Sequence, residues 1–406
     1  MLRSRYNFQS ISAESGNPYT LTHLFFSLLI AIIAASITYL LIFLISESHD
    51  IRTEFPWLVL AMPIVALINW VLKKRTLYYP YKVKDLHEMQ SSDTYAWNRL
   101  MPIYHFIGAS ISHLFGASVG REGVVVLTTT GAVRTMNLSL SYWGPIAAAA
   151  GFAAITGNKW VGLIFIFEMF NTTLSQKVWT FIAGWIAVLI LQSLNVPHLL
   201  PHISVPDANS VITRFLFVIV LAFICGWMAR FFKFGYHAVS DFLKKKSYVW
   251  IVLISAVLGC MLYPESMRSL QSLSSDKIDY FLSGAVLNES DAGLIILKLV
   301  FTMLFVAIGF FGGEYVPLVV VGTGVGVFLA QHFGESIYFG AALSAFALFA
   351  GVSRLKWTMI VLTVSLAGLS HSIWIYIFYT LVVSISGDKS LYFERASKQF
   401  SYKFGF

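Results

Sequence analysis

Charged side chains are scarce in this chain: Asp, Glu, Lys and Arg make up 12% of its 406 residues, against roughly 25% in an average soluble domain. Hydrophobic residue types make up 57%, and the mean hydropathy is +0.72. A soluble fold with so few charges could not cover its own surface, so the composition excludes an ordinary soluble enzyme and a disordered chain. It predicts an all-α membrane protein with many spans of about 20 residues each.

Cysteine is scarce as well, and the two that are present, Cys225 and Cys260, lie in separate apolar runs without metal-ligand spacing. This pattern argues against zinc and against redox chemistry. His198 and His202 are one helical turn apart, but the prolines beside them interrupt any helix there. With no nucleophile–base pair in the sequence, we expect neither a metal, nor a cofactor, nor an enzymatic activity.

Negative charge is outnumbered by positive charge, with 28 Lys and Arg residues against 20 Asp and Glu and a net charge of +8. Nucleic-acid binding is one interpretation, but the positive residues cluster in short segments between apolar runs, which is the positive-inside pattern. Lys73–Arg75 and Lys244–Lys246 are therefore predicted to be cytoplasmic, together with Arg230 and Lys233 after the run Phe215–Met228. We expect a multi-pass protein of a bacterial-type inner membrane with both termini in the cytoplasm and no bound nucleic acid.

Two polar segments are predicted to be external loops. One is the acidic stretch 47–55 after the first apolar run, Leu24–Ser46, and the other is Ser266–Ser290. Many remaining apolar stretches, between 103 and 170 and between 294 and 385, are short and interrupted by Gly and Pro. Short, broken helices are typical of transporters whose helices end at a site in the middle of the membrane.

An internal repeat supports this architecture. Phe152–Trp160 resembles Phe349–Trp357, and a Gly-rich turn precedes each copy at a similar distance, at Gly120–Val124 and at Gly313–Pro317. Chance similarity between apolar sequences is the alternative explanation. The pattern otherwise predicts two related halves with binding turns in matching positions.

Ionisable residues inside apolar segments are functional candidates, because a charge in the membrane costs several kcal/mol unless it faces a cavity or a partner. In Gly116–Val126, glycines flank the pair Arg121–Glu122, and an apolar helix follows at once. Backbone N–H groups at such a helix start form an anion site. A carboxylate there can occupy the site itself and leave it when protonated. The alternative is that Glu122 only stabilises the helix start through the macrodipole.

Two further segments carry charge in apolar surroundings. In Phe310–Pro317, a Gly-rich turn with Glu314 meets a helix whose first turn suits Pro317. A capped helix start is the alternative there. In Thr156–Glu168, a snorkelling lysine and a carboxylate near the cytoplasmic end explain the charges without a function.

These motifs resemble the CLC chloride channel/transporter family, and most of all its CLC-F fluoride/proton antiporter branch. The turn GREGV is similar to GREGP or GREGT of the family, so the resemblance places Glu122 on the external gating glutamate. GGEYVP is similar to GGE-x-T-P of the fluoride members, which makes Glu314 a second carboxylate near the pathway. Lys389–Tyr392 resembles the KPLY start of the last helix and places Tyr392 on the central tyrosine.

The resemblance also shows departures from the family pattern. Gly157–Glu168 is similar to the NAPLAGxxFxxE helix, and the internal proton glutamate falls on Met169, so it is absent, as in fluoride members. The first filter turn is expected at Tyr81–Leu86, where two lysines replace a Gly and a Pro. Val316 replaces the threonine of fluoride members.

The resemblance implies a homodimer in the lipid bilayer, with a pore in each subunit that transports halide anions and protons. Glu122 would carry the proton and Glu314 would be the second carboxylate. The residues expected to bind the anion are Tyr81, Lys82, Val83, Arg121, Gly123, Val124, Tyr315, Val316 and Tyr392.

The function that follows is fluoride/proton antiport, with a chloride channel or chloride/proton exchanger as one alternative and a transport-inactive scaffold as another. We place a cytoplasmic segment at 1–20 and a transmembrane domain at 21–400, without a soluble C-terminal domain. Within that domain, the first repeat covers about 21–195, the second about 210–386, and a final pore-lining helix about 388–400.

Overall fold

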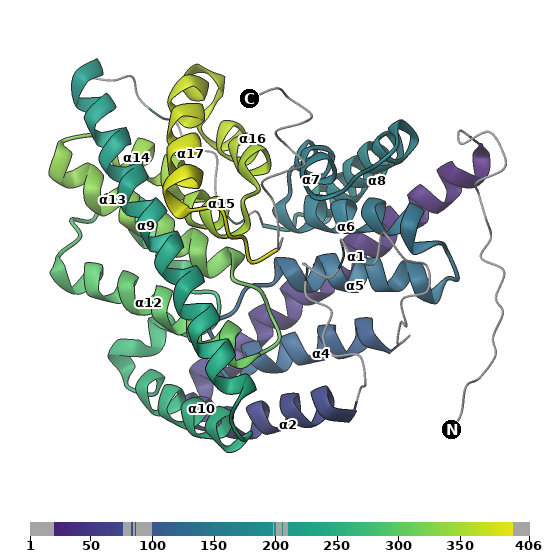
Figure 1. Ribbon diagram of the computed structural model, residues 1–406, viewed down its shortest axis with the longest axis horizontal. Helices are drawn as coiled ribbons and strands as arrows, with labels where there is room; N and C mark the ends of the chain where they lie inside the picture. Colours follow the sequence, from purple (N-terminus) through teal and green to yellow (C-terminus); the bar gives the residue numbers. More distant parts are fainter. Residues whose placement is uncertain are drawn as a thin grey trace.

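The computed structural model describes residues 20–75, 100–197 and 210–392, together with the single residues 83, 86, 199 and 205. The described part of the chain is helical, and its extended pairing is limited to one isolated β-bridge between Gly120 and Gly313. Figure 1 shows the helices crossing one another at many angles, as the prediction of an all-α fold requires. That prediction is confirmed.

The helices fall into two series along the chain. The first series is α1 (Leu21–Glu54), the 3₁₀ helix η2 (Pro56–Ala61), α2 (Met62–Arg75), α4 (Met101–Leu114), α5 (Glu122–Thr135), α6 (Leu140–Thr156), α7 (Val161–Met169) and α8 (Leu174–Ser193). The second series is α9 (Val211–Lys244), α10 (Val249–Leu262), η3 (Glu265–Leu270), α11 (Asp276–Leu282), α12 (Glu289–Ile308), α13 (Tyr315–Phe333), α14 (Ile337–Ser344), α15 (Ala347–Ser353), α16 (Lys356–Ala367), η4 (Leu369–His371) and α17 (Ser372–Ser386).

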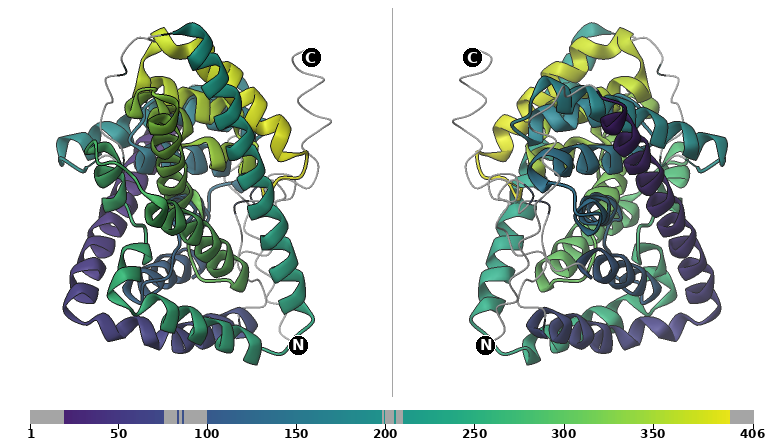
Figure 2. Two further views of the ribbon diagram at one scale, coloured as in Figure 1. Left: turned by 90° about the vertical axis from the view of Figure 1, so that its left-hand side faces the viewer. Right: turned by 90° about the vertical axis from the view of Figure 1, so that its right-hand side faces the viewer.

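The two series match each other. Each opens with a helix of 34 residues, α1 or α9, followed by an apolar helix of 14 residues, α2 or α10. Figure 2 shows the two long helices along opposite edges of the molecule. The helices that carry the repeated sequences end alike. Gly157 after α6 and Arg354 after α15 both adopt left-handed backbone, with φ of 68° and 66°. The predicted repeat of two related halves is confirmed.

Several helices are suited to a membrane. Within the described residues, six helical segments are long and apolar enough to cross one: Leu21–Glu54, Leu174–Ser193, Val211–Lys244, Glu289–Ile308, Tyr315–Phe333 and Leu369–Ser386. Large apolar side chains on these helices are exposed, for example Phe25 on α1 and Phe234 on α9. Other helices are short, such as α5 with 14 residues and α7 with 9. The prediction of a polytopic membrane protein with broken helices is confirmed.

The predicted external loop at 47–55 is wrong, because α1 continues as a helix to Glu54. The reason lies in Arg52, which is buried rather than solvated. Its guanidinium donates to the carbonyl oxygens of Ser48, at 3.0 Å, and of His113 on α4. A charged side chain can be buried in a helix when backbone carbonyls of the same protein accept its hydrogen bonds in place of water.

The segments at 230–233 and 266–290 are also not simple loops. α9 runs through Arg230 and Lys233 to Lys244, and Lys233 is buried. Ser266–Ser290 holds most of η3, the helix α11 and the start of α12. The buried Lys298 of α12 donates to the carbonyls of Leu270 and Ser272, at 3.0 and 2.6 Å, and so ties this segment to the protein. Which side of the membrane each segment faces stays a prediction.

Candidate functional site

The starts of α5 and α13 are joined at the centre of the fold. The N–H of Gly120 donates to the carbonyl of Gly313, and the N–H of Gly313 donates to the carbonyl of Gly120 at 2.9 Å. Each glycine stands two residues before a helix, which begins at Glu122 or at Tyr315. The first N–H groups of a helix have no partner within it and carry partial positive charge. Two such helix starts brought together form a buried region that can bind an anion.

Glycine is needed in these two turns because the backbones approach closely. A Cβ added to Gly120 would lie 3.1 Å from Oε2 of Glu122 and 3.2 Å from the backbone N of Tyr315. Gly312 has a φ of +143°, and a Cβ there would lie 2.5 Å from Cβ of Val119. Any side chain would cover the donors at the helix starts or separate the two turns.

The carboxylate of Glu122 lies on these donors. Its side chain is buried, and Oε2 accepts a hydrogen bond of 3.1 Å from the N–H of Arg121. Nε of Arg121 lies 3.7 Å from Oε1. The N–H of Val316, in the first turn of α13, also faces this carboxylate. Glu122 therefore uses N–H groups from both helix starts, which are the donors that an anion would use.

A second carboxylate lies at the start of α13. Glu314 is the N-cap residue of that helix and is buried, and the hydroxyl of Tyr392 donates a hydrogen bond of 2.5 Å to its Oε1. Phe349 of α15 packs edge-on against both rings, with centroid distances of 4.8 Å to Tyr315 and 5.8 Å to Tyr392. The segment that follows α17 is thereby held at the start of α13.

The other residues predicted to bind the anion lie in the same place as far as the structure describes them. Gly123 and Val124 are in the first turn of α5, as Val316 is in the first turn of α13. Cγ2 of Val83 lies 3.6 Å from the position that a Cβ on Gly123 would take, so this part of the first turn borders α5.

Tyr81 and Lys82 lie outside the described residues, and their predicted role stays a prediction.

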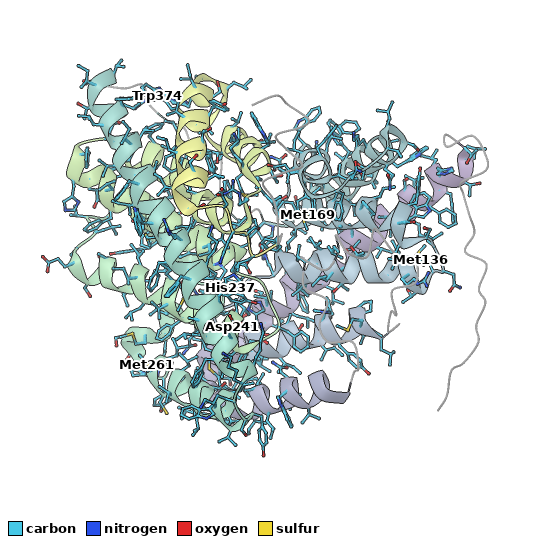
Figure 3. All side chains as sticks on the ribbon, in the orientation of Figure 1. Met136, Met169, His237, Asp241, Met261 and Trp374 are labelled. Atoms are coloured by element: carbon cyan, nitrogen blue, oxygen red, sulfur yellow. The ribbon has the colours of Figure 1, made fainter. Side chains whose placement is uncertain are left out.

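Glu168 has a contact that the sequence did not indicate. Its carboxylate accepts hydrogen bonds from the N–H groups of Trp357 and Thr358, at 2.8 and 2.7 Å, and from the Thr358 hydroxyl at 2.5 Å. The last turn of α7 thus caps the start of α16, which is its counterpart in the other half. The neighbouring Met169, labelled in Figure 3, is buried among apolar residues and supplies no carboxylate.

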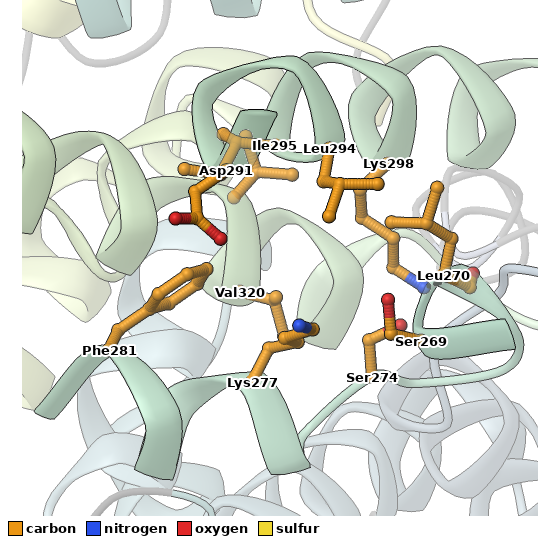
Figure 4. Close-up of a pocket in the computed structure, with 11 residues that line it drawn as sticks. Ser269, Leu270, Ser274, Lys277, Phe281, Asp291, Leu294, Ile295, Lys298 and Val320 are labelled. Carbon is orange, nitrogen blue, oxygen red and sulfur yellow. Dashed lines mark hydrogen bonds between the residues drawn. The ribbon is translucent and has the colours of Figure 1, made fainter. Parts of the chain in front are cut away.

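A pocket lies apart from the two turns, between α11, α12 and α13. Figure 4 shows Asp291 of α12 and Lys277 of α11 reaching toward it, with the ammonium of Lys298 beside Leu270. Most of its remaining wall is apolar, including Val320 of α13. Lys298 already donates to two backbone carbonyls, so the pocket offers a ligand few polar partners. Among the residues that the structure describes, no group of three His, Cys, Asp or Glu side chains could hold a metal ion.

The sequence profile of the family described as voltage gated chloride channel matches residues 65–387, most of the chain. The chain belongs to this CLC family. It is similar to a chloride/fluoride channel protein of Pseudomonas syringae pv. tomato, with 24% identity over 375 residues that cover 86% of this chain and 81% of that protein. This confirms the resemblance seen in the sequence, and anion transport is the activity of the family.

Solved CLC structures share the fold. The structure of a CLC-type fluoride/proton antiporter superposes with a TM-score of 0.79 and 22% identity, covering 91% of this chain and 96% of that one. A slow cyanobacterial Cl⁻/H⁺ antiporter gives a TM-score of 0.76 with 15% identity, covering 93% and 96% of the two chains. A eukaryotic CLC transporter gives 0.71 with 17% identity, covering 92% and 73%. CLC proteins are channels or transporters, not enzymes.

Sequence reasoning missed how the fold of this CLC protein supports Tyr392. Phe349 packs against the Tyr392 ring and Lys233 donates to the carbonyl of Lys389 in the preceding turn, although neither is in a motif at the helix starts. A signal for Lys233 was present, because it is a charge within a long apolar segment. The positive-inside rule assigned Lys233 to a cytoplasmic loop instead, so it was not considered as a buried residue.

Proposed function

We propose that this CLC protein exchanges fluoride for protons across the membrane, with Glu122 as the gating and proton-carrying carboxylate. The observation that carries the proposal is the hydrogen bond of 2.5 Å from Tyr392 to Glu314, a second buried carboxylate in the turn that pairs with the turn of Glu122. Anion transport is the activity of the family; the choice of fluoride and the coupling to protons are the proposed part.

The exchange follows from the position of Glu122. Its carboxylate accepts from N–H groups at the starts of both α5 and α13, so it competes with an anion for the same donors. When Glu122 binds a proton, it loses its negative charge and its strength as an acceptor. An anion then takes its place on the N–H donors while the neutral carboxyl group carries the proton away from them. When the carboxyl group releases the proton to the solution, it returns to the donors as a carboxylate and displaces the anion. One group thereby alternates between carrying the proton and closing the anion path.

The preference for fluoride follows from Glu314 and Tyr392. Fluoride is small and strongly hydrated, so a site must replace its water with several close hydrogen-bond donors. Helix-start N–H groups supply such donors, and the Tyr392 hydroxyl becomes a further one when it is not donating to Glu314. An ionised carboxylate repels an anion, but a protonated one is a short, strong donor that suits fluoride better than chloride. The related fluoride/proton antiporter, which shares the fold, supports this choice.

Chloride is the second candidate, and Val316 favours it. This residue is fully buried in the first turn of α13 and carries no hydroxyl to donate to a strongly hydrated anion. The related protein of P. syringae pv. tomato is named for both chloride and fluoride.

The proposal includes the assembly and the topology predicted from the sequence. We propose a homodimer in a bacterial-type inner membrane with both termini cytoplasmic. The domain would consist of a first repeat at about 21–195, a second at about 210–386 and a final pore-lining segment at about 388–400. The turn at Tyr81 and Lys82 would complete the anion site with a third helix start.

The test is anion flux from liposomes that contain the purified protein and a pH-sensitive dye. Fluoride and chloride are supplied in turn, with an ionophore to collapse the membrane potential. Fluoride efflux that drives proton movement, faster than chloride efflux does, is the expected result. Faster chloride flux would replace the fluoride assignment, flux without proton movement would make the protein a channel, and no flux of either anion would favour a transport-inactive scaffold.

A further inference from the structure

A buried lysine lies within α9, and its role is not explained by the helix starts. The exposed fraction of Lys233 is 4%, and the neighbouring turns of this helix of 34 residues carry Arg230 and His237. We propose that Lys233, together with Arg354, positions Tyr392 against Glu314. The effect on transport rests on the proposed function, whereas the effect on the geometry does not.

The contacts of Lys233 join three separate segments. Its Nζ donates to the carbonyls of Gly351 at 3.0 Å, Gly387 at 3.4 Å and Lys389 at 2.7 Å. Gly351 is in the last turn of α15, and Gly387 directly follows α17. Carbonyls at helix ends lack partners within the helix and carry partial negative charge, so a buried ammonium is stabilised there. A single side chain thus binds two helix ends and the turn that leads to Tyr392.

Arg354 binds the same turn and shares the carbonyl of Gly387 with Lys233. Its Nη1 donates to the carbonyl of Gly387 at 2.6 Å and lies 3.6 Å from Oδ1 of Asp388. The residue has a φ of +66°, in the left-handed region that favours glycine, and the matching position of the first repeat is indeed Gly157. An arginine is therefore present here despite its backbone conformation, and its side chain contacts explain why.

Hydrogen bonds attach the segment that leads to Tyr392 to the end of α15. The N–H of Leu391 donates to the carbonyl of Val352 at 3.2 Å, and the hydroxyl of Ser390 donates to the carbonyl of Ser353 at 2.8 Å. The N–H of Tyr392 in turn donates to Oγ of Ser390 at 3.0 Å. Residues 387–392 therefore follow the end of α15 closely, and the place of the Tyr392 hydroxyl depends on this attachment.

The test compares Lys233→Met with Tyr392→Phe and with the double variant, in two measurements. Hydrogen–deuterium exchange of peptides over 387–392 reports the attachment, and the ratio of fluoride to chloride flux reports the site. We expect Lys233→Met to speed exchange in this segment and to lower the flux ratio about tenfold, as for the loss of one charge-assisted hydrogen bond. The double variant should be no worse than Tyr392→Phe alone, because the two residues act on one contact.

Lys244→Met is the matched control. Lys244 is on the same helix and forms an exposed ion pair of 2.8 Å with Asp241, so its loss should change neither measurement. Arg354→Gly is a second variant, which suits the left-handed backbone and removes the whole side chain, including the guanidinium that binds Gly387. It should also speed hydrogen–deuterium exchange over 387–392. If Lys233→Met does not fold, this variant still tests whether the side chains around Gly387 hold the segment.

Two results would overturn the proposal. One is unchanged exchange over 387–392 in the folded variants. The other is additive losses in the double variant, which would mean that Lys233 acts elsewhere than through Tyr392. If the wild-type protein moves chloride better than fluoride, or moves neither, the proposed function fails, but the exchange measurement still decides whether Lys233 and Arg354 hold this segment.

Discussion

Gly120 and Gly313 bind each other through both of their backbone hydrogen-bonding groups, although they belong to different halves of the chain. Each glycine stands two residues before a helix, so Arg121 and Glu314 occupy equivalent positions in the two turns, as do Glu122 and Tyr315. The carboxylate is thus the first residue of the helix in one half and the N-cap residue in the other. The two related turns therefore carry their carboxylates at different positions relative to the helix start, which suits different tasks for Glu122 and Glu314.

Replacing Gly120 with Ala tests the close approach of the two turns. The new Cβ would lie 3.2 Å from the N of Tyr315 and 3.1 Å from Oε2 of Glu122. It should displace the carboxylate and cover a donor, and so lower anion flux by about tenfold or more. Gly293→Ala is the control, because no heavy atom lies within 4 Å of its added Cβ. Equal flux in both variants would mean that the Gly120 turn is not on the anion path.

Glu122→Gln tests the gate. The amide resembles the protonated carboxyl group in shape and, like it, carries no charge. The anion path should therefore stay open, while proton coupling is lost because the amide cannot bind and release a proton. The measurement is uptake of protons against their gradient in liposomes, driven by an anion gradient. Continued proton pumping by Glu122→Gln would show that another group carries the proton.

Glu314→Ile tests the ion preference. Removing the second carboxylate takes away a charge-assisted hydrogen bond with Tyr392 and a potential donor to fluoride. Fluoride flux should fall about tenfold, the equivalent of 1.4 kcal/mol, and chloride flux should fall less. Equal loss of both fluxes would make Glu314 a structural cap of α13.

Glu168→Ala tests the connection between the two halves. The carboxylate accepts three hydrogen bonds at the start of α16, and the loss of a helix N-cap costs about 1–2 kcal/mol. The variant should lose its monodisperse peak in size-exclusion chromatography at a lower temperature than the wild type. Glu47→Ala, on an exposed face of α1, is the control and should behave like the wild type.

A cysteine introduced at position 245, Lys245→Cys, tests the orientation. The positive-inside rule puts this residue in the cytoplasm, so the cysteine should resist an impermeant thiol reagent added to intact cells. The background must lack Cys260, which is exposed, whereas Cys225 is buried and can stay. Labelling from outside would reverse the predicted topology.

The sequence by itself determined the class of protein and the two motifs that matter. Low charge and long apolar runs fix a membrane fold because polar backbone groups in lipid must be satisfied within helices. The charged pair in GREG and the single glutamate in GGE stand out because a charge inside an apolar segment is costly unless it has a function. These signals are local, so a single sequence is enough to read them.

Only the tertiary structure decided which groups meet. Arg52 and Lys233 look like loop charges in the sequence, yet both are buried in helices, because carbonyls of α4 and of α15 satisfy them. The bonds from Gly120 to Gly313 and from Tyr392 to Glu314 join residues that are far apart in the chain. Such contacts depend on how helices pack, and the periodicity of a sequence does not record that packing. The motif supplied the carboxylates, and the fold determined their partners.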